Sequence, residues 1–217
     1  MAPRIPDTDT RERILAAAAG VFAAHGFAGA RIDDIAEKAG INKAMLYYHV
    51  GDKDKLYAAV LGETVDRAFA TLDQSTRGLP TPAAKLENIL ETIAAFGTSN
   101  RWFVPIMLRE ISSGGRTLPD EMLPRMARIF RVVAEALAEG VESGAFRRTD
   151  PLLTHVSLIG TLMFLIASEP VRERLSRAAG LPVVNHTSAD LAKHIGSLFL
   201  HGVLISPAPK KRSRRKT

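Results

Sequence analysis

Residues 31–56 read RIDDIAEKAGINKAMLYYHVGDKDKL, and they decide the fold because they describe two short helices joined by a sharp corner. The first helix places its isoleucines and alanines on one face and stops at Gly40, the residue type that best adopts a left-handed helix end. Asn42 can cap the second helix, since its side-chain oxygen can accept a hydrogen bond from an unpaired backbone N–H. The pattern therefore predicts a helix–turn–helix with no flexible linker.

The second helix, residues 43–50, is short and rich in polar aromatic side chains. Only Leu46 and Val50, four positions apart, face inward, and the remaining residues face outward: Lys43, Ala44, Met45, Tyr47, Tyr48 and His49. DNA phosphate oxygens accept hydrogen bonds from such polar groups, and a short helix in a major groove presents its first residues to base edges. Asp52 caps a further helix, so Lys53 lies beside N-terminal N–H groups that also suit a phosphate. The segment predicts a DNA-binding unit.

This pattern resembles the DNA-binding domain of the TetR family of bacterial transcriptional regulators. The residues that carry the resemblance are Ile35-Ala36, Ala39-Gly40, Leu46-Tyr47, Tyr48-His49, Lys53 and Leu56, and with the preceding helix the match covers residues 8 to about 66. The resemblance implies phosphate contacts by Tyr47, His49 and Lys53. It also implies base contacts from the start of the recognition helix, where we expect Lys43, Ala44 and Met45 to set the sequence preference.

Two positions depart from the usual family pattern. Arg31 stands where relatives often carry Thr or Ser as a helix cap, and a guanidinium cannot accept a hydrogen bond from a backbone N–H, so about 1 kcal/mol of cap stabilisation is lost. Arg31 can instead offer its charge to a phosphate. Met45 replaces a common Thr, and its apolar tip favours contact with a thymine methyl over a hydrogen-bonded reading of a base.

Composition limits the remaining possibilities. The chain has 217 residues, 46% of them hydrophobic, and it contains no cysteine. Its longest apolar run, residues 156–167, is shorter than a membrane span and predicts a buried helix. No signal segment opens the chain, so we expect a soluble cytoplasmic protein without membrane contact.

The net charge of +6 comes from the C-terminal end of the sequence. Lys210, Lys211, Arg212, Arg214, Arg215 and Lys216 account for all of it. The segment 206–217 has no apolar pattern that could pack, and we expect it to be a disordered basic tail. It is either a solvated tail that aids solubility or a nonspecific anchor to DNA phosphates.

Helical periodicity continues along the chain, and no segment alternates like a strand. We expect an all-α protein of nine or ten helices: residues 10–25, 32–39, 43–50, 53–74, 82–97, 101–113, 120–143 and 151–168, a short helix after Pro170, and 189–204. The expected domains are a DNA-binding domain at 8–66, a regulatory and dimerisation domain at 67–205, and the tail. Expected caps include Thr81, Asn100, Asp150 and Ser188.

The last two long helices predict a homodimer, which the family resemblance also implies. Helix 151–168 is apolar nearly all round, and helix 189–204 combines Leu191, Ile195, Leu198 and Phe199 with small residues. Such faces need cover on more than one side, and a second copy of the chain can supply it.

The resemblance further implies a small-molecule pocket between the middle helices. The candidate lining is Phe96, Trp102, Phe103, Met107, Met126, Phe130, Met163 and Phe164, with Trp102 the strongest single candidate. These residues make a plain core as readily as a pocket. Arg109, Glu110 and His155 are polar residues on apolar helices, and they either orient a ligand or pair with other groups of the protein.

Other classes of site find little support in the sequence. The histidines form no close cluster with acidic residues, so we expect no metal. No nucleophile motif or phosphate loop stands out, so we expect neither a cofactor nor an enzyme. The leading hypothesis is a dimeric repressor that binds a pseudo-palindromic operator in double-stranded DNA and is released by a small-molecule effector. The alternatives are an architectural protein that binds DNA broadly through its basic tail, and an enzyme that only resembles a regulator.

Overall fold

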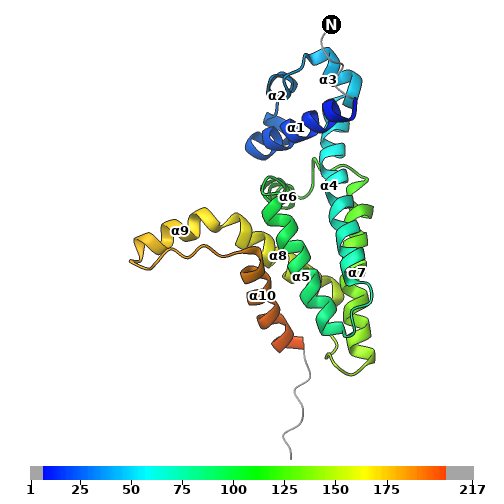
Figure 1. Ribbon diagram of the computed structural model, residues 1–217, viewed down its shortest axis with the longest axis vertical. Helices are drawn as coiled ribbons and strands as arrows, with labels where there is room; N and C mark the ends of the chain where they lie inside the picture. Colours follow the sequence, from blue (N-terminus) through cyan, green and yellow to red (C-terminus); the bar gives the residue numbers. More distant parts are fainter. Residues whose placement is uncertain (1–6, 204–217) are drawn as a thin grey trace, which may run out of the picture.

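The computed structural model describes residues 7–203, and this part of the chain forms ten α-helices and no β-strand, which confirms the expected all-α fold (Figure 1). The first three helices form a head at one end of the molecule: α1 (Asp7–Gly29), α2 (Ile32–Ala39) and α3 (Lys43–Val50). The body contains α4 (Lys53–Thr76), α5 (Pro82–Ser99), α6 (Phe103–Ser112), α7 (Met122–Glu142), α8 (Pro151–Ala167), α9 (Glu169–Ala178) and α10 (Ser188–Val203). The expected basic tail at 206–217 lies outside the described residues.

The corner between α2 and α3 forms as the sequence predicts. Gly40 ends α2 with φ 67° and ψ 37°, a left-handed conformation that a side chain would disfavour. The Asn42 side chain accepts a hydrogen bond from the Met45 N–H at 2.8 Å, and Asp52 caps α4 by accepting from Lys55 N–H at 2.8 Å. Arg31 precedes α2 without any side-chain cap bond, as expected.

Helix α1 is longer than expected. It begins at Asp7, three residues before the expected start, and its regular turns end at Gly26, as expected. Gly26 has φ 69° and ψ 176°, so the chain bends there and then makes one more turn, in which the Ala30 N–H bonds to the Gly26 carbonyl at 3.2 Å. Gly26 therefore ends the regular helix where the sequence pattern predicts, and the turn to Gly29 follows this kink.

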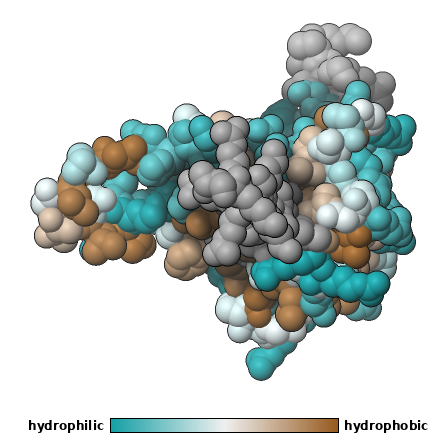
Figure 2. All heavy atoms as spheres, turned by 90° about the horizontal axis from the view of Figure 1, so that it is seen from below, coloured by the Kyte–Doolittle hydropathy of each residue, from teal (hydrophilic) through white to brown (hydrophobic). Residues whose placement is uncertain are grey.

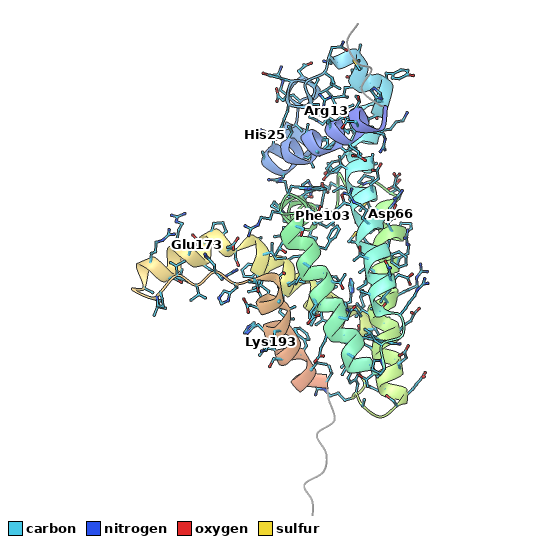
Figure 3. All side chains as sticks on the ribbon, viewed as in Figure 1. Arg13, His25, Asp66, Phe103, Glu173 and Lys193 are labelled. Carbon is cyan, nitrogen blue, oxygen red and sulfur yellow. The ribbon has the colours of Figure 1, made fainter. Side chains whose placement is uncertain are left out.

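Helix α4 runs from the head into the body and contributes to two apolar clusters. Leu56, Tyr57 and Val60 belong to the cluster of the head, whereas Leu72 belongs to the cluster of the body formed with α5, α7, α8 and α10. In the middle of α4, Asp66 forms ion pairs with Arg125 and Arg128 of α7 (Figure 3). The expected domain limit at residue 66 falls inside this continuous helix and stays a prediction.

Two expected helix starts are wrong. Asn100 does not cap α6, because its side-chain amide donates to the Phe96 carbonyl at 2.9 Å and closes α5 instead. Helix α6 therefore begins only at Phe103. At α10 the cap is Thr187, whose hydroxyl accepts from the Asp190 N–H at 3.2 Å while the Asp190 carboxylate accepts from the Thr187 N–H at 2.8 Å. This reciprocal pair fixes the helix start one residue before the predicted cap Ser188.

Helix α9 and the segment after it project from the body as an arm (Figure 1). Apolar residues gather on this arm in the view from below (Figure 2), and its exposed members are Val171, Leu175, Leu181, Val183 and Val184. Among residues 7–203, no single helix is long and apolar enough to cross a membrane. Helices α8 and α9 meet that test only as a pair, which is bent by 61° at its break.

Candidate nucleic-acid interface and internal cavity

Helix α3 presents nearly all of its side chains to solvent at the end of the molecule remote from α10 (Figure 1). Leu46 is fully buried and anchors the helix, whereas Tyr48 is 83% exposed and Tyr47 and Met45 are 46% and 42% exposed. Lys43, at the start of the helix, forms an exposed ion pair with Asp33 of α2 at 2.9 Å. The hydrogen bond to Asp33 raises the pKa of Lys43, so the ammonium stays charged in solution.

Lys53, which follows α3, and His49, near its end, have partners within the head. The Lys53 ammonium donates to the Ala28 carbonyl at 3.3 Å and lies 4.7 Å from the centre of the Phe27 ring. An ammonium has three donors, so Lys53 retains N–H groups for a phosphate. The His49 ring meets the Tyr48 ring edge-on at 5.3 Å.

Helix α6 is joined to the first turns of α4, next to the head, by a buried carboxylate. Glu110 is only 4% exposed, and its Oε1 accepts hydrogen bonds from the Tyr57 hydroxyl at 2.7 Å and the Thr117 hydroxyl at 2.5 Å. The Tyr57 ring packs against Phe22 and Phe27 of α1, with ring centres 4.8 and 5.0 Å apart. Burial, reinforced by the Glu110 contact, raises the pKa of Tyr57, so its hydroxyl remains a donor.

The neighbouring Arg109 makes a second connection. Its guanidinium donates to the Phe22 and Ala23 carbonyls of α1 at 3.3 and 3.4 Å. Of the two readings that the sequence left open for Arg109 and Glu110, the structure shows pairing with groups of the protein. Arg109 connects α6 to α1 and Glu110 connects it to α4, and neither lines the apolar cavity described below.

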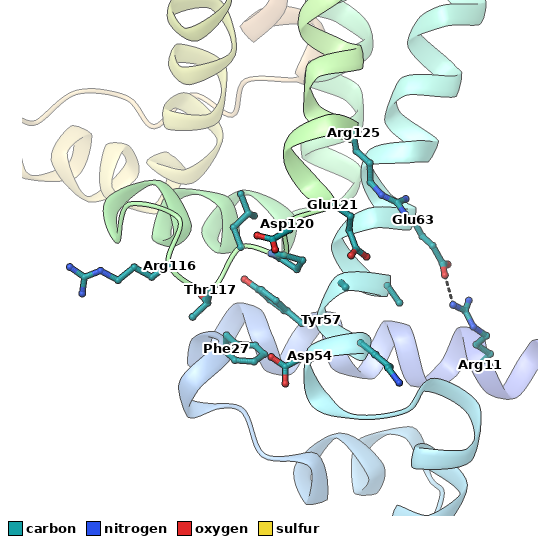
Figure 4. Close-up of a pocket in the computed structure, with 15 residues that line it drawn as sticks. Arg11, Phe27, Asp54, Tyr57, Glu63, Arg116, Thr117, Asp120, Glu121 and Arg125 are labelled. Carbon is teal, nitrogen blue, oxygen red and sulfur yellow. Dashed lines mark hydrogen bonds and ion pairs between the residues drawn. The ribbon is translucent and has the colours of Figure 1, made fainter.

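A broad hollow of about 690 Å³ lies beside this connection, between the head and the loop that joins α6 to α7 (Figure 4). Charges of both signs line it: Arg11, Lys55, Arg116 and Arg125 with Asp54, Glu63, Asp120 and Glu121. Arg11 and Glu63 pair at 2.5 Å. Because positive and negative groups are balanced, the hollow does not favour a ligand of either charge.

A second, smaller cavity of about 110 Å³ lies inside the body. Helices α4 to α8 supply its walls, which are Val65, Ala68, Thr92, Ile93, Phe96, Gly97, Phe103, Val104, Met107, Met126, Ile129, His155, Ile159, Leu162, Met163 and Ile166. No charged Lys, Arg, Asp or Glu side chain is among the described residues of this lining. Burial lowers the pKa of His155, which favours the neutral imidazole.

Comparison with known proteins decides the family. The sequence profile of the bacterial regulatory proteins of the tetR family matches residues 14–60, and that of the tetracyclin repressor-like C-terminal domain matches residues 80–166. An HTH-type transcriptional repressor of Streptomyces coelicolor is 32% identical over 70% of this chain and 74% of its own length. The chain belongs to the TetR family. It is accordingly a DNA-binding transcriptional regulator.

Further TetR-family proteins resemble most of the chain. The HTH-type transcriptional repressor NicS of Pseudomonas putida is 29% identical over 89% of this chain and 92% of its own. The ketosteroid transcriptional regulator KstR2 of Mycobacterium tuberculosis shares the fold with a TM-score of 0.71 and 20% identity, covering 94% of this chain and 99% of its own. The regulator PfmR of Thermus thermophilus gives a TM-score of 0.68 at 23% identity, covering 87% and 97%.

The predicted DNA-contacting residues of this TetR-family regulator lie on three neighbouring elements. Six are on α3, Arg31 directly precedes α2, and Lys53 begins α4. Arg31 and the predicted residues of α3 are exposed, apart from His49, which is half-buried, as is Lys53. The structure thus brings the predicted set to the head, and their contacts with DNA stay a prediction.

The predicted pocket residues divide into two groups. Phe96, Phe103, Met107, Met126, His155 and Met163 line the cavity of the body. Trp102 does not: it lies beside α1 and α4 with Arg11 and Leu15, because adjacent residues at the start of α6 point in different directions. Phe130 also lies outside the lining and packs its ring edge-on against His155 at 5.5 Å, and Phe164 is 65% exposed.

Sequence reasoning missed the wall that α4 contributes. Val65 and Ala68 of α4 line the cavity, and neither residue was among the expected lining. The available signal was the spacing of three residues between them, which places both on one helix face. The Tyr57–Glu110 contact joins residues 53 positions apart, and no local pattern indicates such a pairing.

Proposed function

We propose that this regulator is a repressor that binds a pseudo-palindromic operator as a homodimer and leaves it when a small molecule occupies the cavity of the body. Operator binding would take place in the cytoplasm of a bacterium. The observation that carries the proposal is α3, which buries Leu46 and exposes the residues at its start to solvent. A helix–turn–helix uses such residues to read base edges, while its flanks hold phosphates.

Exposed apolar side chains on α8 and α10 support the dimer. The exposed set is Leu152, Leu153, Val156 and Phe164 on α8, and Leu198 on α10. Their exposed fractions run from 56% to 67%, which is unusual for large apolar residues gathered on packed helices. A second copy placing the same face against them would bury both, and the two heads would then meet two half-sites.

Helix α6 supports the proposed release mechanism. Phe103, Val104 and Met107 on one part of this helix line the cavity. Farther along the same helix, Arg109 bonds to α1 of the head, and Glu110 bonds to Tyr57 of α4, whose ring packs against α1. A ligand that prefers a different position of α6 would therefore also shift the head. The loss of operator affinity would equal the ligand's preference for that conformation over the DNA-binding one.

Selection of bound sites from random duplexes tests the DNA-binding part. The expected result is a motif with two related half-sites, bound by one dimer. Replacing Tyr47, His49 or Lys53 by Ala should weaken specific and random duplexes by similar factors, since phosphates carry no sequence information. Exchanging Lys43, Ala44 or Met45 should change the selected bases.

The same experiment separates repression from broad binding. Affinities for the selected duplex and for a random one are compared across salt concentrations, and the proposal expects a ratio of about a thousandfold or more at physiological salt. A ratio near one would instead favour an architectural protein. An unchanged motif after the exchanges on α3 would contradict the assignment of base contacts.

A further inference from the structure

The composition of the cavity limits the kind of molecule that can occupy it. We propose that the cavity binds a compact, uncharged, apolar molecule carrying one hydroxyl or carbonyl group, and that this group hydrogen-bonds Nδ1 of His155. This inference rests on the proposed function, since it names the effector class for the proposed release. It concerns the free protein and can be tested without DNA.

The absence of charge in the walls excludes an ionised ligand group. The described lining is apolar except for Thr92 and His155, and the Thr92 hydroxyl already shares a hydrogen bond with the Ser75 hydroxyl at 3.1 Å. A carboxylate or phosphate placed there would lose its hydration without gaining a cation. Lysine and arginine are what an anionic ligand would require, and both are missing from this lining.

Among the described residues of the lining, His155 is the one with a buried ring nitrogen that lacks a hydrogen-bond partner. Its Nδ1 is buried and has no hydrogen-bond partner among the residues that the structure describes. A buried polar atom without a partner costs free energy, so a ligand that satisfies it gains affinity. A hydroxyl can both donate and accept, and it suits either tautomer of the neutral imidazole. The Phe130 ring meets the imidazole edge-on at 5.5 Å, which restricts the orientation of the histidine.

The volume limits the size of the occupant. About 110 Å³ is somewhat smaller than the cavity of about 150 Å³ that holds benzene in an engineered protein. Three walls are methionines, Met107, Met126 and Met163, whose flexible side chains can enlarge the space. A single ring with one polar substituent therefore matches the cavity in both size and chemistry.

The test uses phenol as the probe, toluene as the same shape without a donor, and benzoate as the charged ring. The full chain is labelled with ¹³C at its methionine methyl groups, and each compound is titrated into the free protein by NMR. Phenol should shift the signals of Met107, Met126 and Met163 saturably. Met45 on α3 and Met122 in the cluster of the head serve as internal controls and should not move.

Variants then isolate the histidine. His155→Phe should lower the ratio of phenol affinity to toluene affinity about three- to tenfold, because it removes one hydrogen-bond partner but keeps an apolar wall. The matched control His186→Phe lies in the exposed segment before α10 and should leave this ratio unchanged. Because the same ratio is compared between the variant and the unmodified protein, the greater hydrophobicity of toluene affects both values equally. If His155→Phe does not fold, His155→Gln, which keeps a hydrogen-bonding group, should preserve the ratio within about threefold.

The outcomes discriminate between the proposals. Failure of phenol to shift the three methionines, binding of benzoate as tight as that of phenol, or an unchanged ratio in His155→Phe would each overturn the effector class. If the ratio of phenol affinity to toluene affinity in His155→Gln falls about three- to tenfold, as expected for His155→Phe, that result would also overturn the effector class. Operator affinity is measured separately with and without phenol. Phenol binding without loss of operator affinity would leave the site standing and contradict the proposed release.

Discussion

Arg31 occupies a position where helices usually carry a hydrogen-bond acceptor, and it makes no side-chain cap bond to α2. Arg31→Ser should therefore raise the free energy of unfolding by about 1 kcal/mol. It should also weaken DNA binding several-fold, because a cation beside the recognition helix is lost. Urea denaturation and fluorescence anisotropy measure the two effects. Arg131→Ser, an exposed arginine on α7, is the control for DNA affinity, and an Arg31 variant that loses both stability and affinity would contradict the capping argument.

Tyr57 is the second residue whose removal is informative, because it links the head to the buried Glu110. Tyr57→Phe keeps the ring between Phe22 and Phe27 but removes the hydroxyl donor. The free energy of unfolding should fall by about 1 kcal/mol, the usual net value of a buried hydrogen bond. Urea denaturation measures it. Tyr48→Phe, with its ring 83% exposed, should change stability by less than about 0.5 kcal/mol, and equal effects of the two variants would disprove the role given to Tyr57.

At the scale of helices, the sequence predicts best where the deciding interaction is local. Asn42, Asp52, Thr81 and Asp150 all cap the helices expected of them, because a cap depends on residues within three positions. Asn100 was expected to act in the same way, yet its amide finds the Phe96 carbonyl four residues earlier. The sequence alone does not show which of two nearby hydrogen bonds a side chain such as Asn100 will make, the cap of the following helix or the bond to the preceding one.

The candidate pocket shows how such a shift affects predicted sites. Phe103 and Met107 line the cavity, as the apolar pattern suggested, but Trp102 lies beside the head because α6 begins at Phe103. Each residue along a helix turns by about 100°, so neighbours in sequence face different elements. The direction in which a side chain points around its helix axis can therefore be seen only in the packed structure, even where the residue types are predicted correctly.

The exposed faces of α8 and α10 lead to a prediction about assembly. Leu198 on α10 is 61% exposed in one chain, so Leu198→Asp should leave the protomer folded. In the proposed dimer it would bury an unpaired carboxylate, a cost of several kcal/mol that should shift the equilibrium to monomers. Sedimentation measures the mass, and operator affinity should collapse with it. The matched control is Leu123→Asp on α7, where the leucine is 64% exposed. This variant should keep the mass and the operator affinity of the unmodified protein. Equal mass for both variants would contradict this interface.

Across the whole molecule, the head and the internal cavity share α4 and α6. Val65 and Ala68 of α4 line the cavity, while Leu56 and Tyr57 of the same helix belong to the cluster of the head. A change of cavity volume therefore acts on two helices that also fix the head. In the proposed release mechanism, these two shared helices would carry the effect of a bound ligand from the cavity to the head.

The basic tail is a further feature of the whole molecule, because its six cations account for the entire net charge of +6. Deleting residues 206–217 should leave the selected operator motif unchanged, since base contacts are expected from α3. The dependence of affinity on salt should become weaker. If all six charges touch phosphates, the slope of log affinity against log salt would fall by up to about five per chain, and by less if the contacts are transient. Anisotropy titrations over a range of salt concentrations measure it, with a chain of full length whose six basic tail residues are replaced by Gln as the control. The control should show the same slope as the deletion variant, because the charge of the tail and not its length is responsible. An unchanged slope in both variants would indicate that the tail only aids solubility.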